Sequence, residues 1–128
     1  MSVSSVLVVG GGITGCVAAI ALAQRGVDVS LIERSPEWYG VGHGITVQGN
    51  ALKVFKAIGV LDPILEKGLG FDQVRMREAD GTEIATLTVA RTGGEDLPAT
   101  MGALRSDIQN VLVDTIRTLG IEVRLGTE

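Results

Sequence analysis

The chain has few of the residues that build disulfides, metal sites or aromatic clusters. It contains a single cysteine, Cys16, and a single histidine, His43, among 128 residues. One cysteine cannot form an internal disulfide, and one cysteine with one histidine cannot complete a zinc site, so we predict no bound metal. Aromatic residues make up only 3% of the chain, whereas hydrophobic residues make up 45%. The core must therefore be built from Val, Ile, Leu and Ala.

Basic residues and long apolar runs are also scarce. Lys and Arg number 11 against 15 Asp and Glu, and no basic stripe is visible, so we expect no nucleic-acid partner. The longest apolar runs, such as residues 17–23, fall far short of the roughly 20 residues that a membrane span requires. The first residues, "MSVSS", lack the basic region of a signal peptide. These absences favour a cytoplasmic protein with no membrane span.

Glycine, by contrast, is abundant, with 18 residues that gather in clusters. The first cluster lies in "VVGGGITG", residues 8–15. The Val-rich residues 5–9 before it predict a strand buried on both faces, and the Ala-rich residues 14–24 predict a helix that Gly26 ends. Residues 27–32 predict a second strand. Strand, helix and strand in this space indicate a right-handed parallel βαβ unit.

The glycines of this turn have the spacing of a dinucleotide-binding fingerprint, Gly10-x-Gly12-x-x-Gly15. Gly10 permits the tight turn, Gly12 lets the main chain approach a pyrophosphate, and Gly15 lets the helix pack near the strand. The helix start at Ile13 and Thr14 offers N–H groups and a positive dipole end to phosphates.

Glu33 follows the second strand, about 20 residues after the glycines, where an acid accepts hydrogen bonds from the adenosine ribose. Its charge argues against a 2′-phosphate at this position. The fingerprint by itself does not separate FAD from NAD.

The pattern changes after the first unit. Residues 35–44 and 91–100 are predicted as loops, and residues 74–89 alternate apolar and polar around Asp80-Gly81, which is typical of a β-hairpin. Residues 106–119 predict an amphipathic helix in which Ser106 and Gln109 have the spacing of a capping box, and a strand follows. We therefore predict an α/β fold: a Rossmann-like βαβ domain with a parallel sheet and an inserted antiparallel hairpin. Its open sheet edge suggests a truncated architecture.

Three segments resemble the start of a known family. They are "GGGITGCVAAIALAQRGVDVSLIER", "GVGHGITVQGNALKVFKAIGVLDPI" and "ALRSDIQNVLVDTI". In this order they are similar to the FAD-dependent aromatic hydroxylases, flavin monooxygenases related to p-hydroxybenzoate hydroxylase and polyprenyl-methoxyphenol hydroxylases. The resemblance implies that residues 1–128 form the N-terminal part of an FAD-binding domain. It also implies that the hairpin within residues 71–100 belongs to a substrate-side sheet.

The resemblance adds site residues to those of the fingerprint. It implies that the βαβ unit holds the ADP half of FAD, that the loop at Gly44 runs past the cofactor, and that Arg105 contacts FAD with Gln109 close by. In that family the residue at the position of Arg34 often lines the adenosine site. The alternative, equally expected, is that Arg34 is a solvent-exposed charge at the end of a strand. The capping box remains the alternative role for Gln109. No catalytic residue is assigned.

The chemistry implied by the resemblance is ring hydroxylation. NADH or NADPH reduces the flavin, and one oxygen atom of O₂ passes to an aromatic or related ring. Two other hypotheses remain open. The chain could belong to another FAD-dependent oxidoreductase, or it could be a truncated, non-catalytic chain that forms a homodimer or pairs with a missing C-terminal part.

Overall fold

The structure is a computed structural model that describes residues 3–38 and 42–128. Its helices are α1 (Ile13–Ala23), α2 (Gly49–Ala57), α3 (Leu61–Leu65) and α4 (Arg105–Thr118). Its strands are β1 (Ser5–Val9), β2 (Asp28–Glu33), β3 (Gly44–Gln48), β4 (Leu69–Phe71), β5 (Gln73–Arg77), β6 (Glu83–Thr88), β7 (Thr100–Leu104) and β8 (Glu122–Leu125). None of the helices in these described residues has the length and hydropathy that a membrane span requires.

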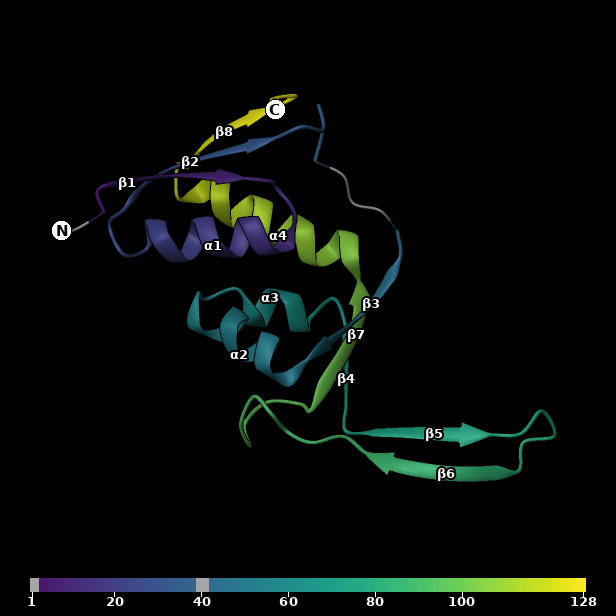
Figure 1. Ribbon diagram of the computed structural model, residues 1–128. Helices are drawn as coiled ribbons and strands as arrows, with labels where there is room; N and C mark the ends of the chain where they lie inside the picture. Colours follow the sequence, from purple (N-terminus) through teal and green to yellow (C-terminus); the bar gives the residue numbers. More distant parts are fainter. Residues whose placement is uncertain (1–2, 39–41) are drawn as a thin grey trace.

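The first part of the fold has two layers, a parallel sheet and a pair of helices packed on one of its faces. The strands run in the order β1-β2-β8, and both pairs are parallel. Helices α1 and α4 contact each other and lie along the same side of this sheet (Figure 1). The α/β class and the Rossmann-like βαβ unit predicted from the sequence are therefore confirmed.

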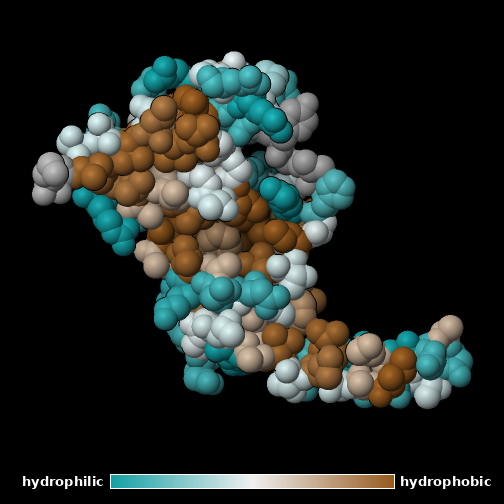
Figure 2. Space-filling view, viewed as in Figure 1, coloured by the Kyte–Doolittle hydropathy of each residue, from teal (hydrophilic) through white to brown (hydrophobic). Residues whose placement is uncertain are grey.

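The prediction that β1 is buried on both faces is wrong. Leu7 is 54% exposed and Val9 is 74% exposed, whereas Val8 packs against the core. Alternate residues of a strand point to opposite faces, and the described helices cover only one of them. Figure 2 shows apolar surface at the end of the molecule that carries β1.

The structure contains a second sheet that the sequence does not predict, and Gly44 and Thr100, expected in loops, lie in its strands. Strand β7 lies between β3 and β4 and is antiparallel to both. The strands are short, and β3 pairs with a partner more than fifty residues away, from Gly44 opposite Leu104 to Gln48 opposite Thr100. Helix α2 packs against β3 and β7, and α3 contacts both α2 and α4.

The start of α4 also differs from the prediction. The helix begins at Arg105, its N-cap is Leu104, and no side chain bonds to the cap. The predicted capping box of Ser106 and Gln109 is therefore wrong. Gln109 is instead 4% exposed and bonds to the glycine loop.

The predicted hairpin is confirmed as β5–β6, with Val74 opposite Leu87 and Met76 opposite Ala85. Figure 1 shows it extending away from the rest of the fold. At its base, the Asp72 carboxylate accepts a hydrogen bond from the N–H of Ala99 at 2.8 Å. The hairpin is thus joined to the body mainly at one end.

One core connects the parallel sheet and its pair of helices to α2 and α3. Its fully buried side chains come from both sheets and from all four helices, which explains how so few aromatics suffice. They include Cys16, Ala19, Ile20, Leu31, Leu52, Ile64, Met101, Leu112 and Ile116.

Candidate functional site

Each of the three fingerprint glycines is favoured at its position for a different structural reason. Gly10 has a φ of +103°, a conformation that L side chains rarely adopt. A Cβ on Gly15 would lie 1.9 Å from the carbonyl oxygen of Gly10, so α1 could not approach β1 as closely. A Cβ on Gly12 would meet no atom within 4 Å. The main chain at Gly12 is therefore open to a ligand on that side.

The N-terminus of α1 is suited to an anion. Its N-cap is Gly12, no side chain bonds to the cap, and no acidic residue lies in the first turn. The first N–H groups of a helix lack intrahelical partners and carry the positive end of the dipole. An incoming phosphate would satisfy N–H groups around Ile13 and Thr14 without displacing a side chain.

Glu33 stands beside this helix start at the end of β2. Its Oε2 accepts a hydrogen bond from the N–H of Gly11 at 2.6 Å, and its Oε1 accepts one from the N–H of Ser35 at 2.9 Å. The bonds from the N–H groups of Ser35 and Gly11 hold the pKa of this carboxyl below its ordinary value. Glu33 is therefore ionised at neutral pH and fixed in direction.

Gln109 reaches the same loop from α4. Its Nε2 donates to the carbonyl oxygen of Gly11 at 2.8 Å and lies 3.3 Å from the sulfur of Cys16. The Cys16 thiol also donates to that carbonyl oxygen, at 3.2 Å. Burial raises the pKa of the Cys16 thiol to about 11, so the thiol stays protonated and serves as a packed donor.

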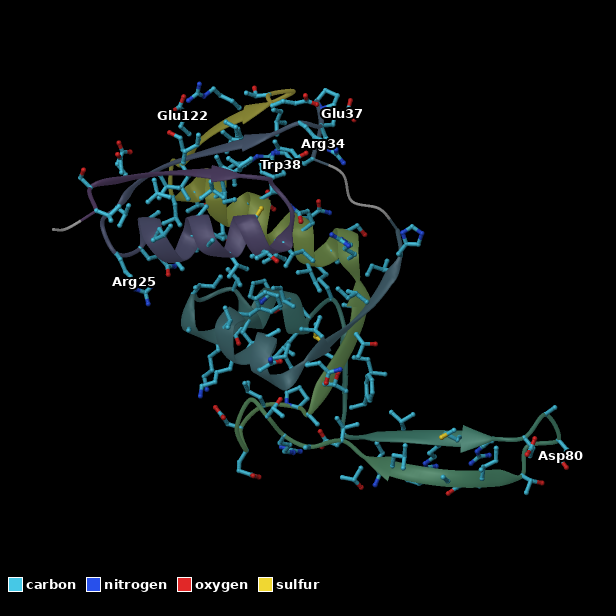
Figure 3. All side chains as sticks on the ribbon, in the orientation of Figure 1. Arg25, Arg34, Glu37, Trp38, Asp80 and Glu122 are labelled. Carbon is cyan, nitrogen blue, oxygen red and sulfur yellow. The ribbon has the colours of Figure 1, made fainter. Side chains whose placement is uncertain are left out.

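These groups line one pocket of about 420 Å³. Its walls are Gly11, Gly12, Glu33, Arg34, Ser35, Glu37, Trp38, Arg105 and Gln109. In Figure 3, Arg34, Glu37 and Trp38 lie together near the end of β2. The pocket thus joins residues from the glycine loop, β2 and the start of α4, which are far apart in sequence.

Half of the predicted site residues share this pocket. Gly12, Glu33, Arg34, Arg105 and Gln109 line it. Of the others, Gly10 lines a neighbouring hollow together with Glu33 and Arg34, and Ile13 lines an apolar hollow beside β3 and α2. Thr14 and Gly15 follow within the first turn of α1, and Gly44 opens β3.

Gly11 and Trp38 belong to the pocket although the fingerprint gives them no role. A Cβ on Gly11 would lie 2.7 Å from Cζ3 of Trp38, so the indole packs directly on this glycine. The sequence carried one signal for Gly11, its place within a run of three glycines. For Trp38 the signal is an aromatic ring in the loop after Glu33, which could cover an adenosine but more simply anchors the loop.

Metal chemistry has no support in the described part of the chain. No group of three or more His, Cys, Asp and Glu side chains could hold a metal ion in residues 3–38 and 42–128. His43 is exposed. The pocket is therefore a candidate binding site in which backbone N–H groups, two carboxylates and two guanidinium groups surround a space open to solvent.

Comparison with known proteins identifies the family. The model of the FAD binding domain matches residues 3–128. The chain belongs to the FAD-binding domain family of the FAD-dependent aromatic monooxygenases. It is 33% identical over 127 residues to the FAD-dependent monooxygenase OpS4 of Beauveria bassiana (strain ARSEF 2860), an alignment that covers 95% of this chain and 29% of that protein.

Two further comparisons agree with this assignment. The chain is 37% identical over 83 residues to 3-hydroxybenzoate 6-hydroxylase of Polaromonas naphthalenivorans (strain CJ2), covering 64% of this chain and 21% of that enzyme. A crystal structure of 2-methyl-3-hydroxypyridine-5-carboxylic acid oxygenase superposes with a TM-score of 0.84 at 31% identity, covering 99% of this chain and 32% of that one. The FAD-binding domain thus spans less than a third of the length of each of these relatives.

Proposed function

We propose that this FAD-binding domain holds the ADP half of FAD in the pocket between the glycine loop, β2 and α4. The observation that carries the proposal is the open approach to Gly12 next to an uncapped helix start and an ionised, oriented Glu33. A diphosphate needs N–H donors and a positive field, and a ribose needs an acceptor. These features support a fit between the residues present and the cofactor.

Each wall of the pocket takes one part of the nucleotide in this proposal. The N–H groups at Gly12, Ile13 and Thr14 receive the diphosphate, and the Glu33 carboxylate accepts from the ribose hydroxyls. Arg34 lines the adenosine end. Arg105, at the start of α4, lines the same pocket and adds a positive charge near the anion.

The reaction belongs to the proposal as well. We infer that the domain serves a monooxygenase in which bound FAD, reduced by NADH or NADPH, supplies oxygen-transfer chemistry to an aromatic or related ring. The names of relatives support this class, since one is a hydroxybenzoate hydroxylase and another oxygenates a hydroxypyridine carboxylic acid. The hairpin within residues 71–100 would lie on the substrate side. The described residues contribute binding and orientation.

A second proposal concerns assembly. The exposed apolar face at Leu7 and Val9 favours a partner surface, either a second copy or a further part of the protein. A tetrameric form is known for the related hydroxypyridine carboxylic acid oxygenase, which supports self-association as one arrangement.

The FAD site is tested by titrating the chain with FAD and with ADP by isothermal calorimetry. Gly12→Val places a side chain in open space at a φ of −71°, so the fold should persist while the diphosphate approach is blocked. Ala57→Val, at the exposed end of α2, is the matched control. Equal affinity of the two variants for ADP would refute the placement of the diphosphate.

The ribose contact has a separate test. Glu33→Ala should weaken ADP binding by about 1.5–3 kcal/mol, because hydrogen bonds to a charged acceptor are strong. Glu66→Ala removes an exposed carboxylate elsewhere and should leave the binding unchanged. An unchanged titration for Glu33→Ala would remove this residue from the site.

A further inference from the structure

The peptide groups on both sides of Gly11 are bonded to side chains from other elements. Its N–H donates to Glu33 Oε2 at 2.6 Å, and its carbonyl oxygen accepts from Gln109 at 2.8 Å and from Cys16 at 3.2 Å. Glu33 ends β2, Cys16 lies on α1 and Gln109 lies on α4. Three elements therefore converge on one residue of the loop.

Packing closes the remaining side of Gly11. The residue is buried, and a Cβ would lie 2.7 Å from Trp38 and 3.1 Å from the Cβ of Glu33. We call Glu33, Cys16, Gln109 and Trp38 the Gly11 clamp.

The clamp has a consequence for the next residue. In a planar trans peptide the C=O of one residue and the N–H of the next point in opposite directions. Because Gln109 and Cys16 hold the Gly11 carbonyl oxygen on their side, the N–H of Gly12 is directed away from them. A peptide between two glycines can otherwise rotate cheaply and present its carbonyl oxygen to the ligand, which would repel a phosphate.

We propose that Gln109, assisted by Cys16, is a positioning residue that locks the Gly11–Gly12 peptide in the orientation that offers the Gly12 N–H to an anion. This assigns Gln109 a role through the loop, beyond the direct cofactor contact expected from the sequence. The proposal rests on the proposed diphosphate site. It also explains why a buried amide on α4 is used to hold a loop 98 residues earlier in the chain.

Two variants of Gln109 separate donation from packing. Gln109→Met keeps the length of the side chain and cannot donate. Gln109→Glu keeps the shape and donates to the Gly11 carbonyl oxygen only when its carboxyl is protonated. Asn110→Asp, an exposed amide-to-acid change on the next residue of α4, adds the same charge and is the matched control.

The first readout is hydrogen exchange of the Gly11 amide in the ligand-free chain, followed by NMR. Gln109→Met leaves the bond from the Gly11 N–H to Glu33 in place but frees the carbonyl oxygen of the same residue. The loop should then open more readily, so this exchange should speed by about tenfold or more. Asn110→Asp should leave it unchanged. An unchanged Gly11 rate in Gln109→Met would overturn the clamp, whether or not the chain binds FAD.

The second readout is ADP affinity as a function of pH. For Gln109→Glu, affinity should be weak near pH 8 and recover toward about pH 5, as the introduced carboxyl regains its proton. The charged groups facing it are Glu33 and Glu37, which favour that protonation, and Arg34 and Arg105, which oppose it. No recovery relative to Asn110→Asp would overturn the proposal.

If Gln109→Met fails to fold, the ADP affinity of Gln109→Glu at low pH, compared with its affinity at high pH, still decides the question. Absence of ADP binding by the unmodified chain would instead contradict the proposed function. In that case the exchange rates of the Gly11 amide would still test the clamp by themselves.

Discussion

The methyl group that glycine lacks sets the geometry of the turn between β1 and α1. At Gly15 an added Cβ would collide with the backbone of Gly10, whereas at Gly12 it would point into open space. Two residues three positions apart in one motif therefore serve different ends. One permits the helix to pack, and the other leaves room for a ligand.

This contrast predicts opposite outcomes for two alanine substitutions. Gly15→Ala should lower the free energy of unfolding by about 1–3 kcal/mol, because the helix must move away from the strand. Gly12→Ala, at a φ of −71°, should change that free energy by less than about 0.5 kcal/mol but weaken ADP binding. Urea denaturation and ADP titration of both variants check this. Equal loss of stability in the two variants would contradict it.

The environment of Glu33 makes the free energy of unfolding depend on pH. Its pKa is lowered in the folded chain by bonds from Ser35 and Gly11, so its contribution to stability is present above the unfolded pKa of about 4.3. That contribution is lost as the pH falls through the lower folded value.

Glu33→Gln should remove this part of the acid sensitivity. Urea unfolding measured between pH 7 and pH 3 should show a smaller fall in stability for Glu33→Gln than for the unmodified chain. Parallel curves for the two proteins would show that the carboxylate bonds do not persist in solution.

At the scale of elements, α4 connects the site to the core. It packs against α1 and α3 and carries Gln109 to the glycine loop. The buried residues of its other turns include Leu112 and Ile116, both 0% exposed. The position of the pocket wall therefore depends on the packing of this helix.

Truncating α4 in the core should destabilise the fold. Leu112→Ala is expected to lower the free energy of unfolding by about 2–5 kcal/mol, since it leaves a cavity at a fully buried site. Leu119→Ala, where the side chain is 41% exposed, should cost less than about 1 kcal/mol. Similar unfolding midpoints for the two variants would contradict the packing of α4.

The sequence predicted the elements whose patterns are local. The βαβ unit, the hairpin around Asp80-Gly81 and the extent of α4 within one residue at each end all followed from periodicity and turn residues. Strands β3 and β7 were missed because they are short, contain glycine and pair across more than fifty residues. The bond from Gln109 to Gly11 could not be predicted for a similar reason: spacing within the helix suggested a cap, whereas the partner lies on another element.

At the scale of the whole molecule, the described residues leave apolar surface open on one side of the parallel sheet. Strand β1 is also an edge strand, since the order is β1-β2-β8. Edges and apolar faces of this kind favour association. The chain spans less than a third of the length of the relatives that it matches.

This surface predicts association that depends on concentration. Leu7→Lys, on the exposed face of β1, should shift sedimentation velocity toward the monomer at high protein concentration. Val54→Lys replaces an apolar residue of comparable exposure, 45%, on α2 and should have little effect. Equal effects of the two variants would contradict a specific role for the β1 face.

The most direct test of the ADP site is an NMR titration of the ¹⁵N-labelled chain with ADP. The amides of Gly12, Ile13 and Thr14 should shift most, together with those around Glu33 and at the start of α4. Saturable shifts confined to these residues would agree with a diphosphate on the N-terminus of α1. Shifts centred on another surface, or no saturable shifts at millimolar ADP, would contradict it.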